Sequence, residues 1–177
     1  MERRCGAVGV TMDKRRTLAL ALIATQFLLL GALAFSFLLL PPDQVLWAQA
    51  LGLAAALSGT IIAALAILTH LRVNRALVNV SPEPNPQRQL VQTGLYRCIR
   101  HPIYLGVMLT AGGAAVAHGH PVGLMLALAL IVFFAGKARF EEQWLAHVYP
   151  AYVDYRRRTG RFLPAIGRCS RTEEATP

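Results

Sequence analysis

The chain has 177 residues, of which 55% are apolar and only 15% are charged, and its mean hydropathy is positive. Soluble domains carry about 25% charged residues, so this composition excludes an ordinary soluble protein and indicates lipid as the main solvent. The formal net charge of +9 suggests a nucleic-acid partner, unless the basic residues are placed for another purpose. The length corresponds to a single membrane domain, 1–177.

Two long apolar runs, 17–40 and 45–69, each exceed the length of a buried soluble helix and predict transmembrane helices. A signal peptide is an alternative for the first run, because the basic segment 1–16 precedes it. The run is longer than the apolar part of a signal peptide, however, and no small-x-small cleavage site follows it. We therefore predict a retained anchor, with two spans within 17–80.

Two shorter apolar stretches, 102–117 and 122–136, flank the sequence His118-Gly119-His120-Pro121. Each has about 16 residues, or roughly 24 Å of helix, against a hydrocarbon core of about 30 Å. We predict that they form a helical hairpin within a core segment 81–166, crossing the bilayer with their ends sunk into the interface. The second helix is expected to continue through 137–147 as an amphipathic helix.

The basic residues form three groups, before the first run, between the second and third, and after the fourth. All 18 fall there, and the connections 41–44 and 118–121 hold none. The positive-inside rule then places both termini in the cytoplasm and predicts four crossings, in the inner (plasma) membrane of the cell. Anionic head groups of membrane lipids account for the positive charge, which excludes a nucleic-acid role.

Within the apolar runs, small residues recur at helical spacing and predict closely packed helices. The two stripes are Gly52, Ala56, Gly59, Ala63 and Gly106, Thr110, Gly113, Ala117. The runs contain no Asp, Glu, Lys or Arg, which argues against an ion channel or a proton-coupled transporter. Any chemistry is therefore expected at the cytoplasmic edge.

The three cysteines, Cys5, Cys98 and Cys169, lie far apart in the sequence and form no CxxC or Cys/His cluster. This spacing indicates neither a disulfide framework nor a zinc site. Because the topology places them in the cytoplasm, we expect reduced thiols.

The third apolar stretch begins with a polar motif. Arg100 and His101 precede Pro102, which suits the first position of a helix, so both side chains are expected at the helix mouth, where free N–H groups favour an anion. Arg100 would add a bidentate contact to a carboxylate. Tyr104 lies in the first turn, and Gly106 would leave room for a flat ligand. The alternative is that these residues are interfacial anchors, a belt aromatic and a packing glycine.

Two adjacent carboxylates, Glu141 and Glu142, follow the fourth stretch amid an excess of positive charge. Neighbouring helix positions differ by about 100°, so at most one of them points straight into a pocket while the other braces it. A carboxylate in a cleft would bind an ammonium group or balance a sulfonium. The alternative pairs Glu142 with Arg139 and Glu141 with Lys137 along the helix.

The third candidate functional segment, 149–164, alternates aromatic residues with arginines. It predicts a short C-terminal interfacial helix, followed by a tail at 167–177. The functional alternative makes Arg161 a contact for a substrate or cofactor anion.

These three segments, in this order, resemble the isoprenylcysteine carboxyl methyltransferase family, within the wider group that includes the phospholipid methyltransferases. The shared pattern is Gly-x-Tyr-x-x-x-Arg-His-Pro-x-Tyr-x-Gly at 94–106, then Glu141-Glu142, then Tyr-Pro-x-Tyr-x-x-Tyr at 149–155 and Arg-x-x-Pro at 161–164. The resemblance covers about half of the chain, roughly 80–166. Of the first two spans only the hydropathy agrees.

The resemblance implies an all-α integral membrane bundle that binds S-adenosylmethionine near the cytoplasmic interface, without a metal. The methyl acceptor would be lipophilic, either a prenylcysteine-like carboxylate or another lipid-like small molecule. By position, the cofactor site would comprise Arg100, His101, Pro102, Tyr104, Gly106, Glu141 and Glu142. Arg161 would hold an acceptor carboxylate, and His101 would be a candidate base for an amine or phenol acceptor.

Two alternatives remain at this point. Integral-membrane sterol reductases, which use NADPH, carry a similar C-terminal pattern but are much longer. A non-catalytic membrane accessory protein would use the arginines and aromatic residues as interface anchors.

Overall fold

The computed structural model describes residues 3–43, 45–75, 89–164 and 169, with side chains from residue 16 onward. The described residues form five α-helices and one 3-10 turn, which confirms the predicted all-α class. The elements in chain order are α1 (Arg3–Leu39), α2 (Leu46–Asn74), η1 (Gly94–Arg97), α3 (Pro102–His118), α4 (Pro121–Val148) and α5 (Tyr152–Arg158). The predicted proline-rich loop at 81–86 and nearly all of the tail lie outside the described residues.

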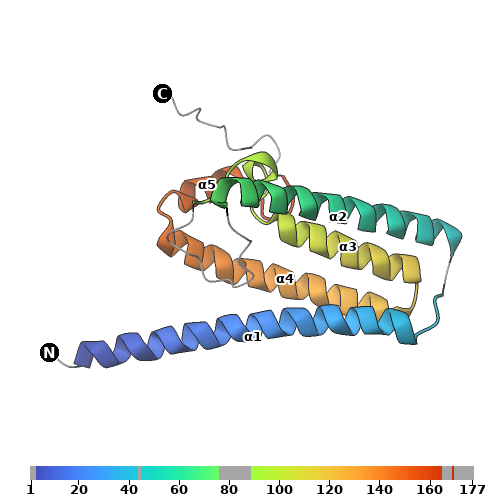
Figure 1. The fold of residues 1–177 in the computed structure, drawn as a ribbon, viewed down its shortest axis with the longest axis horizontal. Coiled ribbons are helices and arrows are strands. Elements are labelled where there is room, and N and C mark those ends of the chain that lie inside the picture. Colours follow the sequence, from blue (N-terminus) through green and yellow to red (C-terminus); the bar gives the residue numbers. More distant parts are fainter. Residues whose placement is uncertain (1–2, 44, 76–88, 165–168, 170–177) are drawn as a thin grey trace.

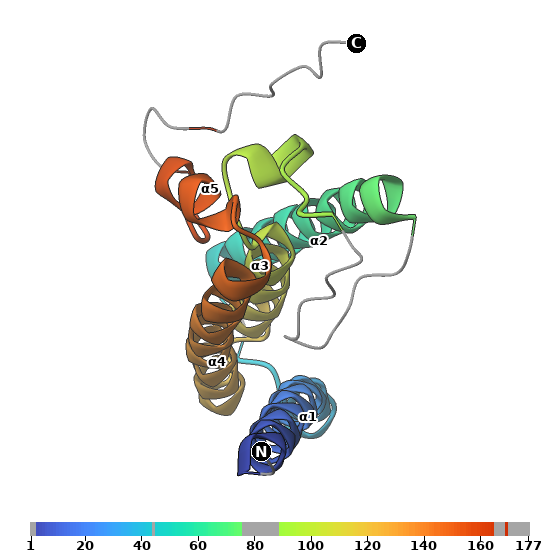
Figure 2. The same ribbon diagram turned by 90° about the vertical axis from the view of Figure 1, so that its left-hand side faces the viewer.

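The four long helices run antiparallel to their neighbours in a curved row (Figures 1 and 2). The order in space is α2, α3, α4, α1, so the first helix packs against α4 rather than against α2. The start of α1, the end of α4, η1 and α5 all lie at one end of the bundle. We call this end the polar end, because the charged side chains described below gather there.

Three of the predicted spans are confirmed by length and hydropathy, and one is not. Residues Arg16–Leu39 of α1, the whole of α2 and the whole of α4 are long and apolar enough to cross a bilayer. With 17 residues, α3 is only about 26 Å long. Its length is set at both ends, by Pro102 at its first position and by Gly119 after its last.

The turn between α3 and α4 requires glycine. Gly119 has a φ of +82°, and a Cβ built on it would overlap the carbonyl oxygen of Asp43. The ring of His120 then caps α4 by accepting a hydrogen bond from the N–H of Val122 at 3.2 Å, and Pro121 occupies the first turn. The predicted break and hairpin are confirmed.

Helix α1 begins at Arg3 and so extends from the first predicted span, 17–40, back into the basic segment 1–16. Arginine, lysine and methionine are good helix formers, and no proline interrupts 3–16, so the helix extends beyond its apolar part.

The two predicted stripes of small residues face each other along the α2–α3 seam. A Cβ on Gly59 would lie 2.5 Å from the backbone N of Thr110, and one on Gly106 would lie 2.6 Å from the backbone N of Ala63. The hydroxyl of Thr110 also lies 3.2 Å from that of Thr60. The backbones therefore touch, as expected where packing rather than the hydrophobic effect joins helices in lipid.

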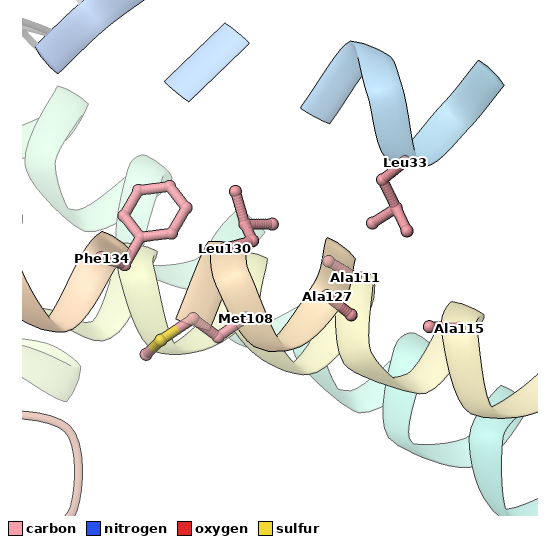
Figure 3. Packing of buried hydrophobic residues seen from close by; sticks show 7 residues of the cluster. All are labelled: Leu33, Met108, Ala111, Ala115, Ala127, Leu130 and Phe134. Carbon is pink, nitrogen blue, oxygen red and sulfur yellow. The ribbon is translucent and has the colours of Figure 1, made fainter. Parts of the chain in front are cut away.

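A smaller apolar core joins α1, α3 and α4. Phe134 and Leu130 of α4 are fully enclosed, and they pack with Met108 of α3 and Leu33 of α1 (Figure 3). The outer faces of the helices remain apolar: Leu28 is 72% exposed and Leu57 is 64% exposed. Apolar surface of this extent indicates a lipid-embedded protein.

Candidate functional site

A short stretch of backbone pairing brings the Arg-His-Pro motif to the C-terminal segment. The N–H of Arg100 donates to the carbonyl of Gly160 at 2.9 Å, and the N–H of His101 donates to the carbonyl of Arg161 at 3.0 Å. In return, the N–H of Gly160 donates to the carbonyl of Cys98 at 3.0 Å. Two segments some 60 residues apart are thus fixed side by side, and their side chains share one environment.

Glu142 is the centre of this environment. Arg100 donates its Nε to Oε1 at 3.0 Å, while Arg161 donates Nε to Oε1 at 2.9 Å and Nη2 to Oε2 at 2.7 Å. The Nε2 atom of His101 lies 3.5 Å from Oε1. The Glu142 side chain is only 3% exposed, so its charge is neutralised by buried partners rather than by water.

These contacts decide between the alternatives for Glu142. Arg139, the helical neighbour that would pair with it at i, i+3, is exposed, and the two residues that pair with it come from other elements. The hydrogen bonds that Arg161 donates to Glu142 raise the pKa of Arg161, which stays cationic, and 32% of its side chain is exposed.

Arg100 is a brace between elements. Besides its bond to Glu142, its Nη1 donates to the backbone carbonyl of Arg156 at 3.0 Å and to that of Thr159. These carbonyls lie in the last turn of α5 and in the residue that follows it. The guanidinium of Arg100, which precedes α3, therefore links the start of α3 to Glu142 of α4 and to the end of α5. The predicted bidentate contact of Arg100 with a ligand anion competes with these bonds.

Glu141 points to a different set of partners. The hydroxyl of Tyr104 donates to its Oε1, and Nδ1 of His101 lies 3.6 Å from its Oε2. The rings of His101 and Tyr104 stack, with centroids 5.4 Å apart and planes 7° from parallel. The two carboxylates therefore lie on either side of one imidazole, Glu142 facing the arginines and Glu141 facing the tyrosine.

Lys137 and Gln26 also reach this region; Lys137 was expected only as an alternative helical partner of Glu141, and Gln26 was not predicted. Lys137 is 1% exposed, its Nζ donates to Oε1 of Gln26 at 2.6 Å, and the same Nζ lies 5.4 Å from the centre of the Tyr104 ring. A glutamine within the first apolar run and a lysine one turn before Glu141 were the available signals. Through this pair α1 is joined to the polar end of α4.

Two tyrosines of α5 complete the cluster. The Tyr155 hydroxyl donates to the carbonyl of Tyr96 at 2.6 Å and so attaches α5 to η1. Tyr152 is 1% exposed, yet its hydroxyl has no hydrogen-bond partner among the described residues. The sequence analysis treated this segment as an interfacial helix, so neither hydroxyl was singled out.

Two residues predicted to line the cofactor site are instead packed against other parts of the protein. Pro102 is fully buried at the first position of α3. The space beside Gly106, predicted to admit a flat ligand, is filled by Ala63 of α2. The alternative interpretation of Gly106, as a packing glycine, agrees with this geometry.

The expectation of reduced thiols was wrong for two of the three cysteines. Cys98 and Cys169 form a disulfide across 71 residues of sequence. The pairing is possible because Cys98 lies in the segment that pairs with Gly160, and Cys169 follows Gly160 by only nine residues in the sequence. Sequence spacing alone does not reveal this proximity.

Comparison with known proteins supplies an independent view. Residues 47–152 match the phospholipid methyltransferase family. The chain is 30% identical over 123 residues to protein-S-isoprenylcysteine O-methyltransferase B of Arabidopsis thaliana, an alignment that covers 68% of this chain and 61% of the plant protein. It is 31% identical over 126 residues to protein-S-isoprenylcysteine O-methyltransferase of Rattus norvegicus, covering 70% of this chain and 43% of the rat protein.

A relative that is not named as a methyltransferase is the cobalt-zinc-cadmium resistance protein CzcN of Cupriavidus metallidurans. The chain is 35% identical to it over 78 residues, an alignment that covers 44% of this chain and 36% of that protein. In each of these three comparisons the chain spans less than two thirds of the relative's own length. The family match includes Arg100, His101, both glutamates and, as its last residue, Tyr152.

Proposed function

This integral membrane chain belongs to the phospholipid methyltransferase family, and we propose that it transfers a methyl group from S-adenosylmethionine to a lipophilic acceptor. The single observation that carries the proposal is the convergence on Glu142. Residues from two other motifs, Arg100 and His101 before α3 and Arg161 after α5, meet this one carboxylate at the polar end of the bundle. A residue set that served only as interfacial anchors would face lipid head groups instead of one another.

The residues of the cluster fit the amino-acid end of S-adenosylmethionine, which carries an ammonium, a carboxylate and a sulfonium. Glu141 offers a carboxylate that accepts a hydrogen bond from Tyr104 but has no arginine against it, which suits an ammonium or a sulfonium. His101 is buried, and its Nε2 has no hydrogen bond among the described residues. We assign His101, Tyr104 and Glu141 to cofactor binding, with Glu142 and Arg100 holding the surrounding backbone in place.

The bound cofactor would supply an electrophilic methyl group. A carboxylate oxygen of the acceptor attacks the methyl carbon, the carbon–sulfur bond breaks, and its electron pair remains on sulfur, so that a methyl ester and a neutral thioether result. No proton moves in this reaction. Catalysis can therefore come from alignment and from exclusion of water, which a largely buried cluster beside lipid provides.

Arg161 is assigned to the acceptor. Its guanidinium is held to Glu142 in a two-point contact, it is the most exposed charged side chain of those that meet at Glu142, and it stays cationic. A prenylcysteine-like carboxylate is the acceptor favoured by the named activities of the plant and rat relatives. For an amine or phenol acceptor, His101 would be the candidate base.

We further propose that the polar end faces the cytoplasm and that the membrane is the plasma membrane. All 18 basic residues lie in segments expected at this end. In this arrangement α3 also crosses the membrane, which brings the number of crossings to four. The bilayer thins by a few ångströms around this helix of about 26 Å.

The test is binding of S-adenosylhomocysteine to the detergent-purified protein, measured by calorimetry. We expect saturable binding, and we expect membranes incubated with radiolabelled methyl donor to yield a labelled lipid or prenylcysteine compound. Binding of NADPH instead would favour the reductase alternative. Binding of neither compound would favour the accessory-protein alternative and overturn the proposal.

A further inference from the structure

Within the part of the chain that the structure describes, the two tyrosines of α5 differ in the hydrogen bonding of their hydroxyls. Both are buried, and their rings contact edge to face with centroids 5.9 Å apart. Burial, the largest cause in each case, raises both pKa values above the ordinary range, so both hydroxyls are neutral donors. Tyr155 gives its proton to a backbone carbonyl, whereas the Tyr152 hydroxyl bonds to nothing described.

A buried hydroxyl without a partner is costly. Such a group lowers the stability of the folded chain, because the hydroxyl loses its hydration without gaining a hydrogen bond in return. Phenylalanine would fill the same space without this cost, so the hydroxyl calls for an explanation of its own.

The surroundings of Tyr152 indicate what it faces. One turn after it, the carbonyl of Arg156 accepts a hydrogen bond from Arg100, which places this face of α5 against the Glu142 cluster. After burial, the charge that most affects the Tyr152 hydroxyl is that of Glu142, followed by the opposing charge of Arg100. The hydroxyl therefore lies in the field of the candidate site.

We propose that Tyr152 is a ligand-binding residue whose hydroxyl donates a hydrogen bond to a carboxylate oxygen of a bound molecule. Both oxygens of Glu142 already accept bonds from arginines, and Arg100 is bonded to α5 one turn after Tyr152, so a second carboxylate is the matching acceptor for this neutral donor. Because the hydroxyl is closed to water, the ligand has to displace a neighbouring side chain to reach it. This inference rests on the proposed function.

Two molecules in the proposed reaction carry such a carboxylate, the cofactor and the acceptor. The comparison of S-adenosylhomocysteine with 5′-methylthioadenosine separates them, because the second compound lacks the amino-acid carboxylate. Farnesylcysteine derivatives report on the acceptor.

The experiment compares Tyr152→Phe with Tyr155→Phe in the full-length, detergent-purified protein. We expect Tyr152→Phe to keep or raise the thermal midpoint of unfolding. We also expect it either to weaken S-adenosylhomocysteine binding or to raise the KM for farnesylcysteine, in each case about 10- to 100-fold. Weaker S-adenosylhomocysteine binding with unchanged 5′-methylthioadenosine binding would assign the bond to the cofactor, and a raised KM for farnesylcysteine with unchanged S-adenosylhomocysteine binding would assign it to the acceptor. Tyr155→Phe, which removes a satisfied hydroxyl, is expected to lower the thermal midpoint and to keep affinity near that of the unmodified protein.

Three results are decisive. If the unmodified protein binds S-adenosylhomocysteine and Tyr152→Phe binds both it and the acceptor equally well, Tyr152 contacts no ligand and the inference is overturned. If Tyr152→Phe lowers the thermal midpoint as Tyr155→Phe does, the hydroxyl has an internal partner and the inference is also overturned. Absence of binding by the unmodified protein would reject the proposed function itself.

Discussion

The α2–α3 seam and the polar end are built on opposite principles. In the seam, residues as small as Gly59 and Gly106 allow two backbones to touch, and the contact repeats along both helices. At the polar end, Arg100 from the segment before α3 and Arg161 from the segment after α5 meet at the single carboxylate of Glu142 in α4. The seam is stable because its glycines have no side chains, whereas the polar end is stable because its charged side chains are paired.

The difference matters for how each region responds to change. A side chain added to the seam would overlap mainly backbone atoms, which cannot rotate away as a flexible side chain can, so the two helices would have to separate. A side chain changed at the polar end leaves the packing intact but exposes an uncompensated charge to a poorly solvated region. The first kind of change should affect folding alone, and the second should affect folding and ligand binding together.

The largest effect is expected from Glu142→Gln. The substitution keeps shape but leaves Arg100 and Arg161 without their counter-charge, at a cost of about 3 kcal/mol in unfolding free energy. We also expect S-adenosylhomocysteine binding to fall below detection. Thermal unfolding in detergent and calorimetry measure the two effects. Asp154→Asn is the control, since Asp154 is 66% exposed and should tolerate the same change.

The next effect is expected from Gly59→Ala. The new Cβ would lie 2.5 Å from the N of Thr110 and 2.6 Å from the O of Gly106, so the helices must separate, at a cost of about 1–3 kcal/mol. Thermal unfolding measures the loss. Gly31→Ala is the matched control, because no atom lies within 4 Å of its Cβ position. Equal midpoints for the two variants would contradict a close-packed seam.

A smaller effect is expected from Arg161→Lys. Lysine keeps the charge but loses the two-point contact with Glu142, so we expect the KM for a farnesylcysteine acceptor to rise about tenfold. S-adenosylhomocysteine affinity should change less, and a parallel loss of cofactor affinity would argue that Arg161 serves the cofactor instead. Steady-state kinetics and calorimetry distinguish these results, with Arg157→Lys, on the exposed face of α5, as control.

The smallest effect is expected from Cys169→Ser. The site uses the backbone carbonyl of Cys98, not its sulfur, so methyl transfer should change less than about threefold, within the range of a surface substitution. Maleimide labelling tests the bond itself: the Cys169→Ser protein should expose Cys98 without reductant. If Cys98 and Cys169 of the unmodified protein label fully without reductant, the disulfide is not present in solution.

Features that repeat locally could be predicted from sequence. The glycine stripes, the break at His118-Gly119-His120-Pro121 and the helical class follow from spacing and from turn chemistry, which act within a few residues. The extension of α1 beyond the first apolar run, back to Arg3, was not predicted, because the apolar pattern ends before the helix does.

Features that depend on distant residues could not be predicted with the same detail. The sequence singled out Arg100, His101, Glu141, Glu142 and Arg161, but did not indicate that Glu142 would bind two arginines or that Glu141 would bind Tyr104. It gave no reason to select Gln26, named Lys137 only as a helical partner of Glu141, and included Tyr152 only in the pattern at 149–155, because a sequence does not show which polar residues become buried.

By itself, then, the sequence determined which solvent surrounds this protein, which residues its helices use to pack, and which side chains carry charge. Tertiary structure alone decided which of those charges meet, because the pairing of 98–101 with 160–161 joins segments that no local periodicity relates. The physical reason is range: helix formation and turn formation act over a few residues, whereas a buried ion cluster exists only after the chain has closed around it.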